Sequence, residues 1–140
     1  MNSTVNTMCV SGISGSLVRT ECFITNGLPA FEVVGLPDTA VKEARERVRA
    51  AAKTSGLAFP AGRITLNLSP ANLKKSGTHF DLPILLSILI AYGQMKPAPE
   101  GTAFVGEVSL DGYIRPVPGI LSMVLAAKDH GIKTDRKSVV

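Results

Sequence analysis

The chain has 140 residues, of which 45% are hydrophobic, 19% are charged and 5% are aromatic, which is typical of one compact domain and excludes an intrinsically disordered chain. The net charge of +4 is mild, so it permits contact with an acidic polymer such as DNA without requiring it. The longest apolar run, residues 82–92, is much shorter than the roughly 20 residues that cross a bilayer, and no secretory leader opens the chain, so we expect a cytoplasmic protein with no membrane partner.

Three β-strands are predicted at the start of the chain. Residues 4–13 and 17–25 alternate loosely between apolar and polar side chains around the turn-forming sequence SGISGS, which predicts a hairpin. After a second break at NGLPA, residues 31–34 predict a short third strand. Cys9 and Cys22 fall on the two strands of the hairpin, so a bridge between them is conceivable. Two thiols do not form a disulfide framework, and we favour buried free cysteines.

The clearest helical pattern covers residues 39–55. Asp38, at the end of a GLPD turn, is placed to cap the helix N-terminus, and Gly56 is placed to end the helix. One side is apolar and is predicted to face the core: Val41, Ala44, Val48 and Ala51 or Ala52. The other side is charged and is predicted to face solvent: Lys42, Glu43, Arg45, Glu46, Arg49 and Lys53.

The middle of the chain predicts a strand followed by a central helix. Residues 63–68 alternate strictly between polar and apolar side chains, as a half-buried strand does. Residues 82–92 are apolar on every side, so this helix must lie in the middle of the fold. Asp81 is placed to cap the helix.

A hairpin and a last helix are predicted at the end. Residues 103–110 and 113–117 flank an Asp-Gly dipeptide, the sequence of a type I′ turn. Residues 119–130 predict a helix, after which a further strand would begin where the sequence stops, and we expect a fragment of a longer chain. The order βββ-α-β-α-ββ-α predicts a single mixed α/β (α+β) domain over residues 1–140.

The chain closely resembles the N-terminal domain of the Mg-chelatase-like AAA+ proteins of bacteria, the ComM/YifB group, in three blocks: FEVVGLPDTAVKEARERVRAA, RITLNLSPANLKKSGTHFDLPILLSIL and FVGEVSLDGYIRPVPGIL. The resemblance implies the fold shared by the Lon protease proteolytic domain and the second domain of a small-subunit ribosomal protein. It also implies an AAA+ ATPase module outside these residues, which uses ATP and Mg²⁺ in a hexameric motor linked to DNA branch migration during natural transformation. The sequence contains no G-x-x-x-x-G-K-[ST] loop, so we expect no cofactor and no ATP hydrolysis in this fragment.

The Lon resemblance points to the segment KSGTHFD. In Lon-type proteases the serine of a K-D-G-P-S-A-G motif is the nucleophile, and a lysine after a G-G-[IL] turn activates it. In this sequence His79 occupies the serine position and Leu121 occupies the lysine position. Neither side chain supplies the missing group, so we expect no catalytic residue and no enzymatic activity in this chain. The alternative is a Lon-like peptidase with rearranged groups, for which Asp81 and Ser122 are the nearest polar candidates.

His79 has a simpler expected role. Its ring is predicted to bond a backbone carbonyl in a turn, and a ligand or DNA contact is the alternative. Two histidines, His79 and His130, with no Cys/His spacing pattern predict no metal site.

Cations of the helix over residues 39–55, together with three cations that follow it, indicate where nucleic acid would bind. The helix carries Lys42, Arg45, Arg49 and Lys53, and the later candidates are Arg63, Lys74 and Lys75. A row of this kind predicts sequence-nonspecific, salt-sensitive contact with phosphates. The alternatives are a solvated Lys74-Lys75 turn and a solvated helix face, on which Glu43 pairs with Arg47 and Glu46 pairs with Arg49.

Base stacking and protein contacts complete the expectations. Tyr92 and Tyr113 are predicted to pack inside the protein, so no aromatic platform for bases is expected. In a ring-forming motor the same domain would contact its own AAA+ module and neighbouring subunits. The sequence therefore predicts an accessory domain that engages DNA or supports ring assembly.

Overall fold

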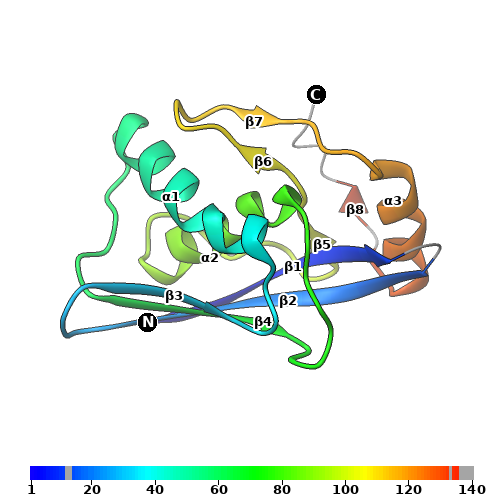
Figure 1. Cartoon of the computed structure of the whole chain (residues 1–140), viewed down its shortest axis with the longest axis horizontal. Helices are drawn as coiled ribbons and strands as arrows, with labels where there is room; N and C mark the ends of the chain where they lie inside the picture. The colour runs from blue at the N-terminus through cyan, green and yellow to red at the C-terminus, as the bar shows by residue number, and fades with distance from the viewer. Residues whose placement is uncertain (12–13, 133, 136–140) are drawn as a thin grey trace.

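A computed structural model describes residues 1–11, 14–132 and 134–135. Within these ranges, six strands form one mixed sheet in the order β3-β4-β2-β1-β5-β8 (Figure 1). The strands of this sheet are β1 (Asn2–Ser11), β2 (Ser14–Thr25), β3 (Ala30–Val34), β4 (Arg63–Ser69), β5 (Thr102–Ala103) and β8 (Thr134–Asp135). The other elements are α1 (Thr39–Thr54), the 3₁₀ turn η1 (Thr78–Phe80), α2 (Asp81–Ala91), the strands β6 (Glu107–Val108) and β7 (Ile114–Arg115), and α3 (Ile120–Asp129). The predicted mixed α/β class is confirmed.

The sheet is built on the long antiparallel hairpin of β1 and β2, whose register runs from Asn2 opposite Phe23 to Ser11 opposite Ser14. Strand β4 is antiparallel to β2, and β3 is parallel to β4. On the other side β5 is parallel to β1, and β8 is parallel to β5. The hairpin, the third strand and the fourth strand are therefore confirmed, and the predicted strand end at Ile13 lies outside the described residues.

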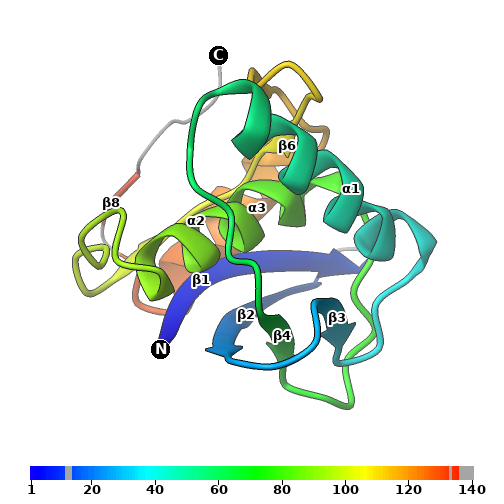
Figure 2. The ribbon, with the colours of Figure 1, turned by 90° about the vertical axis from the view of Figure 1, so that its left-hand side faces the viewer.

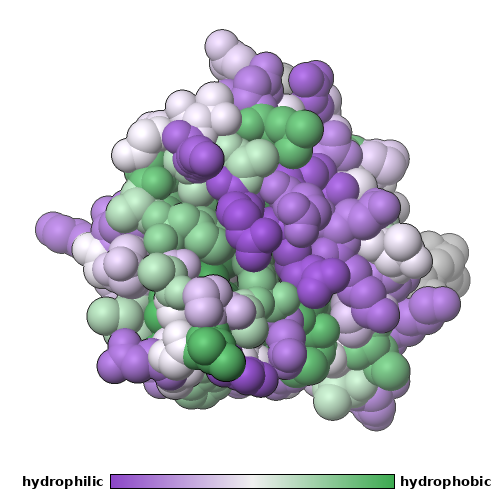
Figure 3. All heavy atoms as spheres, turned by 60° about the vertical axis from the view of Figure 1, so that its left-hand side comes forward, coloured by the Kyte–Doolittle hydropathy of each residue, from purple (hydrophilic) through white to green (hydrophobic). Residues whose placement is uncertain are grey.

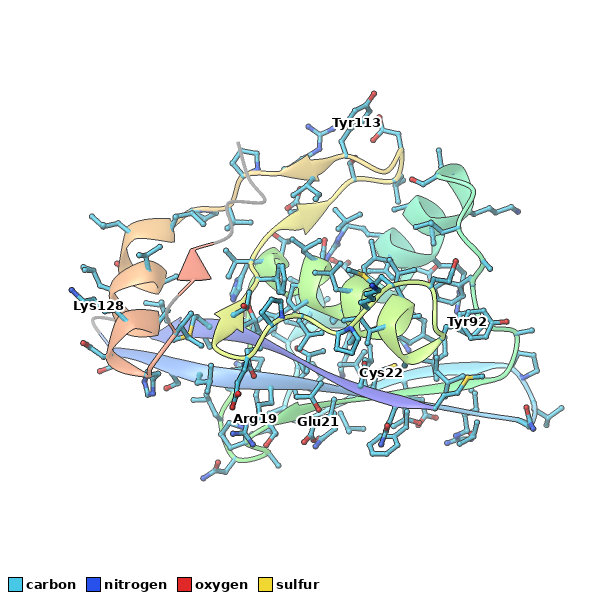
Figure 4. All side chains as sticks on the ribbon, turned by 180° about the vertical axis from the view of Figure 1, so that it is seen from behind. Arg19, Glu21, Cys22, Tyr92, Tyr113 and Lys128 are labelled. Atoms are coloured by element: carbon cyan, nitrogen blue, oxygen red, sulfur yellow. The ribbon has the colours of Figure 1, made fainter. Side chains whose placement is uncertain are left out.

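Helices α1 and α2 lie on the same side of the sheet (Figures 1 and 2). The predicted inward side of α1 is confirmed: Val41, Ala44, Val48, Ala51 and Ala52 are all buried. Along β2 the side chains alternate, so that Cys22 points between the sheet and α2 while Arg19 and Glu21 point away from the helices (Figure 4). The core thus lies between one face of the sheet and the two helices.

The two predicted helix caps have opposite outcomes. Asp38 caps α1 as predicted, since its Oδ1 accepts a hydrogen bond of 2.8 Å from the Val41 amide. The predicted cap by Asp81 is wrong. The chain enters α2 through η1 with Phe80 already in helical conformation (φ −73°, ψ −15°) and with no side-chain cap, so Asp81 is the first residue of α2 and its carboxylate bonds elsewhere.

The predicted hairpin around the Asp-Gly dipeptide is present, since β6 pairs antiparallel with β7. Its predicted first strand over residues 103–110 is wrong, because that stretch divides into two elements. Strand β5 belongs to the main sheet, whereas β6 pairs with β7 in a separate hairpin. Between them Gly106 donates to the His79 carbonyl at 3.1 Å and accepts from the Leu82 amide at 3.0 Å. These two bonds turn the chain away from the sheet and toward the N-terminus of α2.

Both cysteines are buried and unbridged, as expected. Cys9 lies opposite Ser16 and Cys22 lies opposite Ser3, so the two residues are not cross-strand partners. Burial raises the pKa of Cys22 to about 12, which leaves this thiol protonated and unreactive. Within the described ranges, no helix has the length and apolarity that crossing a bilayer requires.

We predict that the packing of α3 on the β1–β2 hairpin at Gly15 depends on the absence of a side chain there. A Cβ added to Gly15 would lie 2.1 Å from the Cβ of Ala126, so Gly15→Ala should lower the free energy of unfolding by about 1–3 kcal/mol. The matched change is Ala126→Gly, which costs about 1 kcal/mol by helix propensity in the native chain. In the Gly15→Ala background, Ala126→Gly should instead raise the free energy of unfolding measured in urea, because it removes the clash. If the losses of the two single variants simply add in the double variant, the contact is contradicted.

Candidate functional site

An ion pair between a partly exposed arginine and a buried carboxylate fixes the segment that the Lon resemblance singles out. Arg47 of α1 donates to both carboxylate oxygens of Asp81, from Nε to Oδ2 at 2.6 Å and from Nη2 to Oδ1 at 2.9 Å. The Asp81 side chain is fully buried, and its Oδ2 also accepts from the Val108 amide at 3.1 Å. Burial raises the pKa of Asp81, while the bonds from Arg47 and Val108 oppose that shift. The pair therefore joins α1, α2 and β6 at one point.

His79 precedes Asp81 by two residues and is also buried. Its Nε2 lies 2.6 Å from the Met8 carbonyl oxygen, which confirms the expected bond to a backbone carbonyl. Because a carbonyl only accepts, Nε2 carries the proton, and burial lowers the pKa of the ring. Within the described part of the chain, no hydroxyl or thiol bonds to either ring nitrogen.

Leu121, which occupies the lysine position in the Lon resemblance, is in a different environment from His79. Leu121 lies on α3 with 73% of its surface exposed, whereas His79 is 6% exposed. The neighbouring Ser122 lines a cleft of about 390 Å³ between α3 and the start of β2, which His130 also lines. Eight helical positions separate Ser122 from His130, about 12 Å of helix, and His130 Nε2 bonds the Gly15 carbonyl at 3.2 Å. Ser14 and Asp129 line the same cleft. Among the described residues no hydrogen bond joins a hydroxyl to His79 or to His130, so neither position shows the nucleophile–base pair that a hydrolase needs.

The structure corrects the prediction made for the turn of Lys74 and Lys75. Lys75 is fully buried rather than solvated, and its Nζ donates a hydrogen bond to the Pro70 carbonyl. Its backbone amide and carbonyl bond Leu36 and Asp38 at 2.9 Å each. Burial lowers the pKa of this amine. Lys75 thus holds the loop before α1, and only Lys74 of this pair is exposed.

The cations of α1 divide into two groups. Lys42, Arg49 and Lys53 are exposed along the outer side of the helix. Arg45 is half-buried, because it donates to the carbonyls of Lys42 at 3.0 Å and Phe31 at 3.2 Å. The predicted pairs of Glu43 with Arg47 (4.0 Å) and Glu46 with Arg49 (3.7 Å) are present. Arg63 lies on β4 and pairs with Glu32 at 3.4 Å.

Two phenylalanine rings lie under Arg49, but they form no exposed platform for bases, since Phe31 is buried and Phe59 packs against the core. The Arg49 guanidinium lies 5.7 Å from the centre of the Phe31 ring and 5.8 Å from that of Phe59, a cation–π arrangement. The loop after α1 brings Phe59 back to this position, which the local pattern did not reveal. Tyr92 packs against the core as predicted, whereas Tyr113 is 69% exposed.

Comparison with known proteins shows which sequences are similar to this chain. The sequence profile of the family described as subunit ChlI of Mg-chelatase matches residues 20–135. The chain is similar to the uncharacterized protein YifB of Escherichia coli, with 42% identity over 139 residues that cover 99% of this chain and 27% of that protein. It is similar to competence protein ComM of Haemophilus influenzae, with 44% identity over 118 residues that cover 84% of this chain and 23% of that protein.

A weaker similarity links the chain to a Lon protease of Flavobacterium johnsoniae, with 32% identity over 130 residues that cover 88% of this chain and 16% of that protein. The chain spans about a quarter of the length of YifB, ComM and their near relatives.

We predict that Arg47→Met strongly destabilises the protein, because it leaves the Asp81 carboxylate buried without its cation. The expected loss in free energy of unfolding is about 3–5 kcal/mol, measured by urea unfolding followed by circular dichroism. Lys53→Met on the exposed side of the same helix is the control and should change the value by less than about 0.5 kcal/mol. Equal effects of the two substitutions would show that the pair contributes nothing.

We predict that His79 makes the protein less stable at acidic pH. The pKa of the His79 ring in the folded protein lies below its ordinary value of 6.5. Below pH 6.5 the ring is therefore protonated in the unfolded chain before it is protonated in the folded chain. Stability is therefore full above pH 6.5 and falls as the pH decreases from there toward the folded pKa. His79→Gln should remove this fall in urea unfolding series, and an unchanged pH profile in the variant would assign the fall to other groups.

Proposed function

Because the chain belongs to the family described as subunit ChlI of Mg-chelatase, with YifB and ComM among its relatives, we propose that it is a non-catalytic accessory domain of an AAA+ ATPase and that it engages DNA. Membership confirms the resemblance seen in the three sequence blocks. In this proposal ATP and Mg²⁺ are used by an ATPase module outside these residues, in a cytoplasmic hexamer. The DNA contact is made by the outer side of α1.

The observation that carries the proposal is the line of exposed cations Lys42, Arg49 and Lys53. Figure 3 shows a continuous hydrophilic band across the face that carries α1. The line from Lys42 to Lys53 is roughly 16 Å long on a helix, which suits contact with a few successive phosphates. Arg49 is held over two phenylalanine rings, so less side-chain freedom is lost when it binds.

The electrostatics favour weak, nonspecific binding. Glu43 and Glu46 lie between the cations and reduce the local field. With about three phosphates neutralised, the logarithm of the binding constant should fall with the logarithm of salt concentration with a slope near −3. The name of the Haemophilus influenzae relative, competence protein, supports a role on DNA, since competence is the uptake of DNA.

The alternative of a rearranged peptidase has less support. Such an enzyme needs a hydroxyl or thiol beside a base. His79 instead bonds the Met8 carbonyl and is buried under β1. Peptide turnover abolished by His79→Ala would favour the peptidase and count against an accessory role.

We predict that charge reversal on α1 strongly weakens DNA binding without unfolding the domain. Lys42→Glu with Lys53→Glu should weaken binding of duplex, forked and single-stranded DNA at least tenfold in fluorescence anisotropy at low salt, since both lysines are exposed. Arg45 is left unchanged, because it bonds two backbone carbonyls.

The matched control for this experiment is Lys96→Glu, an exposed lysine in the loop after α2, which should change affinity less than twofold. Unchanged binding in the double reversal would remove α1 from the proposal. An absence of binding by the native chain at low salt would leave ring assembly as the function of the domain.

A further inference from the structure

The loop that joins β2 to β3 contains an asparagine followed by a glycine, Asn26 and Gly27. The loop projects from the end of the sheet (left in Figure 1), and residues 26–29 are all exposed. Gly27 has a φ of +140°, and a Cβ added to it would meet no atom within 4 Å. The peptide bond between Asn26 and Gly27 is therefore open to water and free of neighbouring side chains.

The hydrogen bonds around this loop leave both groups unused. Thr25, which lies opposite Arg63, is the last residue of β2 in the ladder with β4. In the described part of the chain, neither the Asn26 side chain nor the Gly27 amide takes part in a hydrogen bond. The amide nitrogen is thus free to lose its proton to solvent, and the side-chain carboxamide is free to turn toward it.

We propose that Asn26 is a site of spontaneous deamidation. The Gly27 nitrogen loses its proton to hydroxide and attacks the side-chain carbonyl carbon of Asn26. A new C–N bond forms, and the bond from that carbon to Nδ2 breaks to release ammonia. Water then opens the five-membered succinimide ring at either of its carbonyl carbons, which leaves aspartate or isoaspartate at position 26. Glycine favours the attack because no side chain shields its nitrogen.

The other asparagines of the chain lack this combination. Asn2, Asn6 and Asn67 lie in β-strands, where pairing with a neighbouring strand fixes the backbone. Asn72 is exposed in a turn, but the amide that follows it belongs to Leu73 and donates to a backbone carbonyl at 3.4 Å. Asn72 is therefore the matched comparison, since it is equally accessible but is followed by a bulky residue with a bonded amide.

The turn of Asp111 and Gly112 provides a second comparison, because an aspartate before a glycine can close the same ring with loss of water. Hydrogen bonds oppose the reaction there. The Gly112 amide donates to the Ser109 carbonyl at 3.0 Å, and the Asp111 carboxylate accepts from the Ser109 hydroxyl. A Cβ added to Gly112 would lie 2.4 Å from the Ser55 hydroxyl oxygen, so this turn also packs closely on the end of α1.

Deamidation changes both the charge and the main chain beside β4. A Cβ added to Gly62 would lie 2.3 Å from the Thr25 carbonyl oxygen and 3.7 Å from the Asn26 Cα, so the segment before β4 passes directly alongside. The new carboxylate lowers the net charge of +4 by one, and isoaspartate adds one carbon atom to the main chain ahead of β3. In the described sheet β3 pairs with β4 alone, so residues 30–34 should exchange their amide hydrogens faster in the isoaspartate form.

The test incubates the folded chain in mildly alkaline and in mildly acidic buffer and follows its tryptic peptides by mass spectrometry. Cleavage after Arg19 and Lys42 gives a peptide in which Asn26 is the one asparagine. Asn26 should gain about one dalton at least about tenfold faster than Asn72, and faster in the alkaline buffer, since hydroxide removes the amide proton. Asn26→Gln is the control, because its longer side chain closes the ring poorly, and its peptide should stay unchanged.

A second measurement separates the effect of the fold from that of the sequence. An isoaspartate-specific methyltransferase labels the product at either glycine site. In the folded chain the label should appear at position 26 and not at position 111. After incubation in urea it should appear at both positions, because the hydrogen bonds to Ser109 are then lost.

Three outcomes overturn the proposal. If Asn26 reacts no faster than Asn72 in the folded chain, the loop does not present a free amide. If Asn26 reacts in urea but not in the folded chain, folding protects the site. Equal labelling of positions 26 and 111 in the folded chain would show that hydrogen bonds do not govern the reaction. No DNA is present in these measurements, so their result is independent of the function proposed for α1.

Discussion

The bidentate pair between Arg47 and Asp81 is the constraint on which the arrangement of this domain depends. It connects α1 to the first residue of α2, and the Val108 amide adds β6 to the same carboxylate. Each of these groups comes from a different one of the three sequence blocks that mark the family. A buried ion pair adds little net stability compared with apolar packing, but losing one partner is costly. We therefore interpret the pair as the device that sets the register of the three blocks relative to one another.

The same region shows how polar side chains of the segment that resembles the Lon motif are used for structure. Lys75 and His79 both turn inward, and each bonds a backbone carbonyl, of Pro70 and Met8 respectively. In this arrangement a lysine and a histidine satisfy loop and strand carbonyls that burial would otherwise leave unpaired.

Local patterns in the sequence were sufficient to predict α1 with its Asp38 cap, the first four strands, the central helix and the carbonyl bond of His79. They failed where a distant partner decided the outcome. Asp81 has the position of a cap, yet Arg47, 34 residues away, takes its carboxylate. Lys75 sits in a polar stretch, yet the parallel bridge to Pro37 draws it into the interior. The division of β5 from β6 likewise depends on the backbone hydrogen bonds of Gly106 with His79 and Leu82. The alternation of apolar and polar side chains along residues 103–110 does not reveal these bonds.

The chemistry of the α1 cations explains why they separate into structural and exposed members. A guanidinium is planar and presents several donors at fixed angles, so it can satisfy a carboxylate or two carbonyls at once. Arg47 and Arg45 do this, and Arg49 spreads over two rings. A lysine ammonium is a compact, strongly hydrated point charge, and Lys42 and Lys53 stay at the surface. The exposed cations of α1 are therefore two lysine point charges and Arg49, whereas the two arginines with fixed partners are structural.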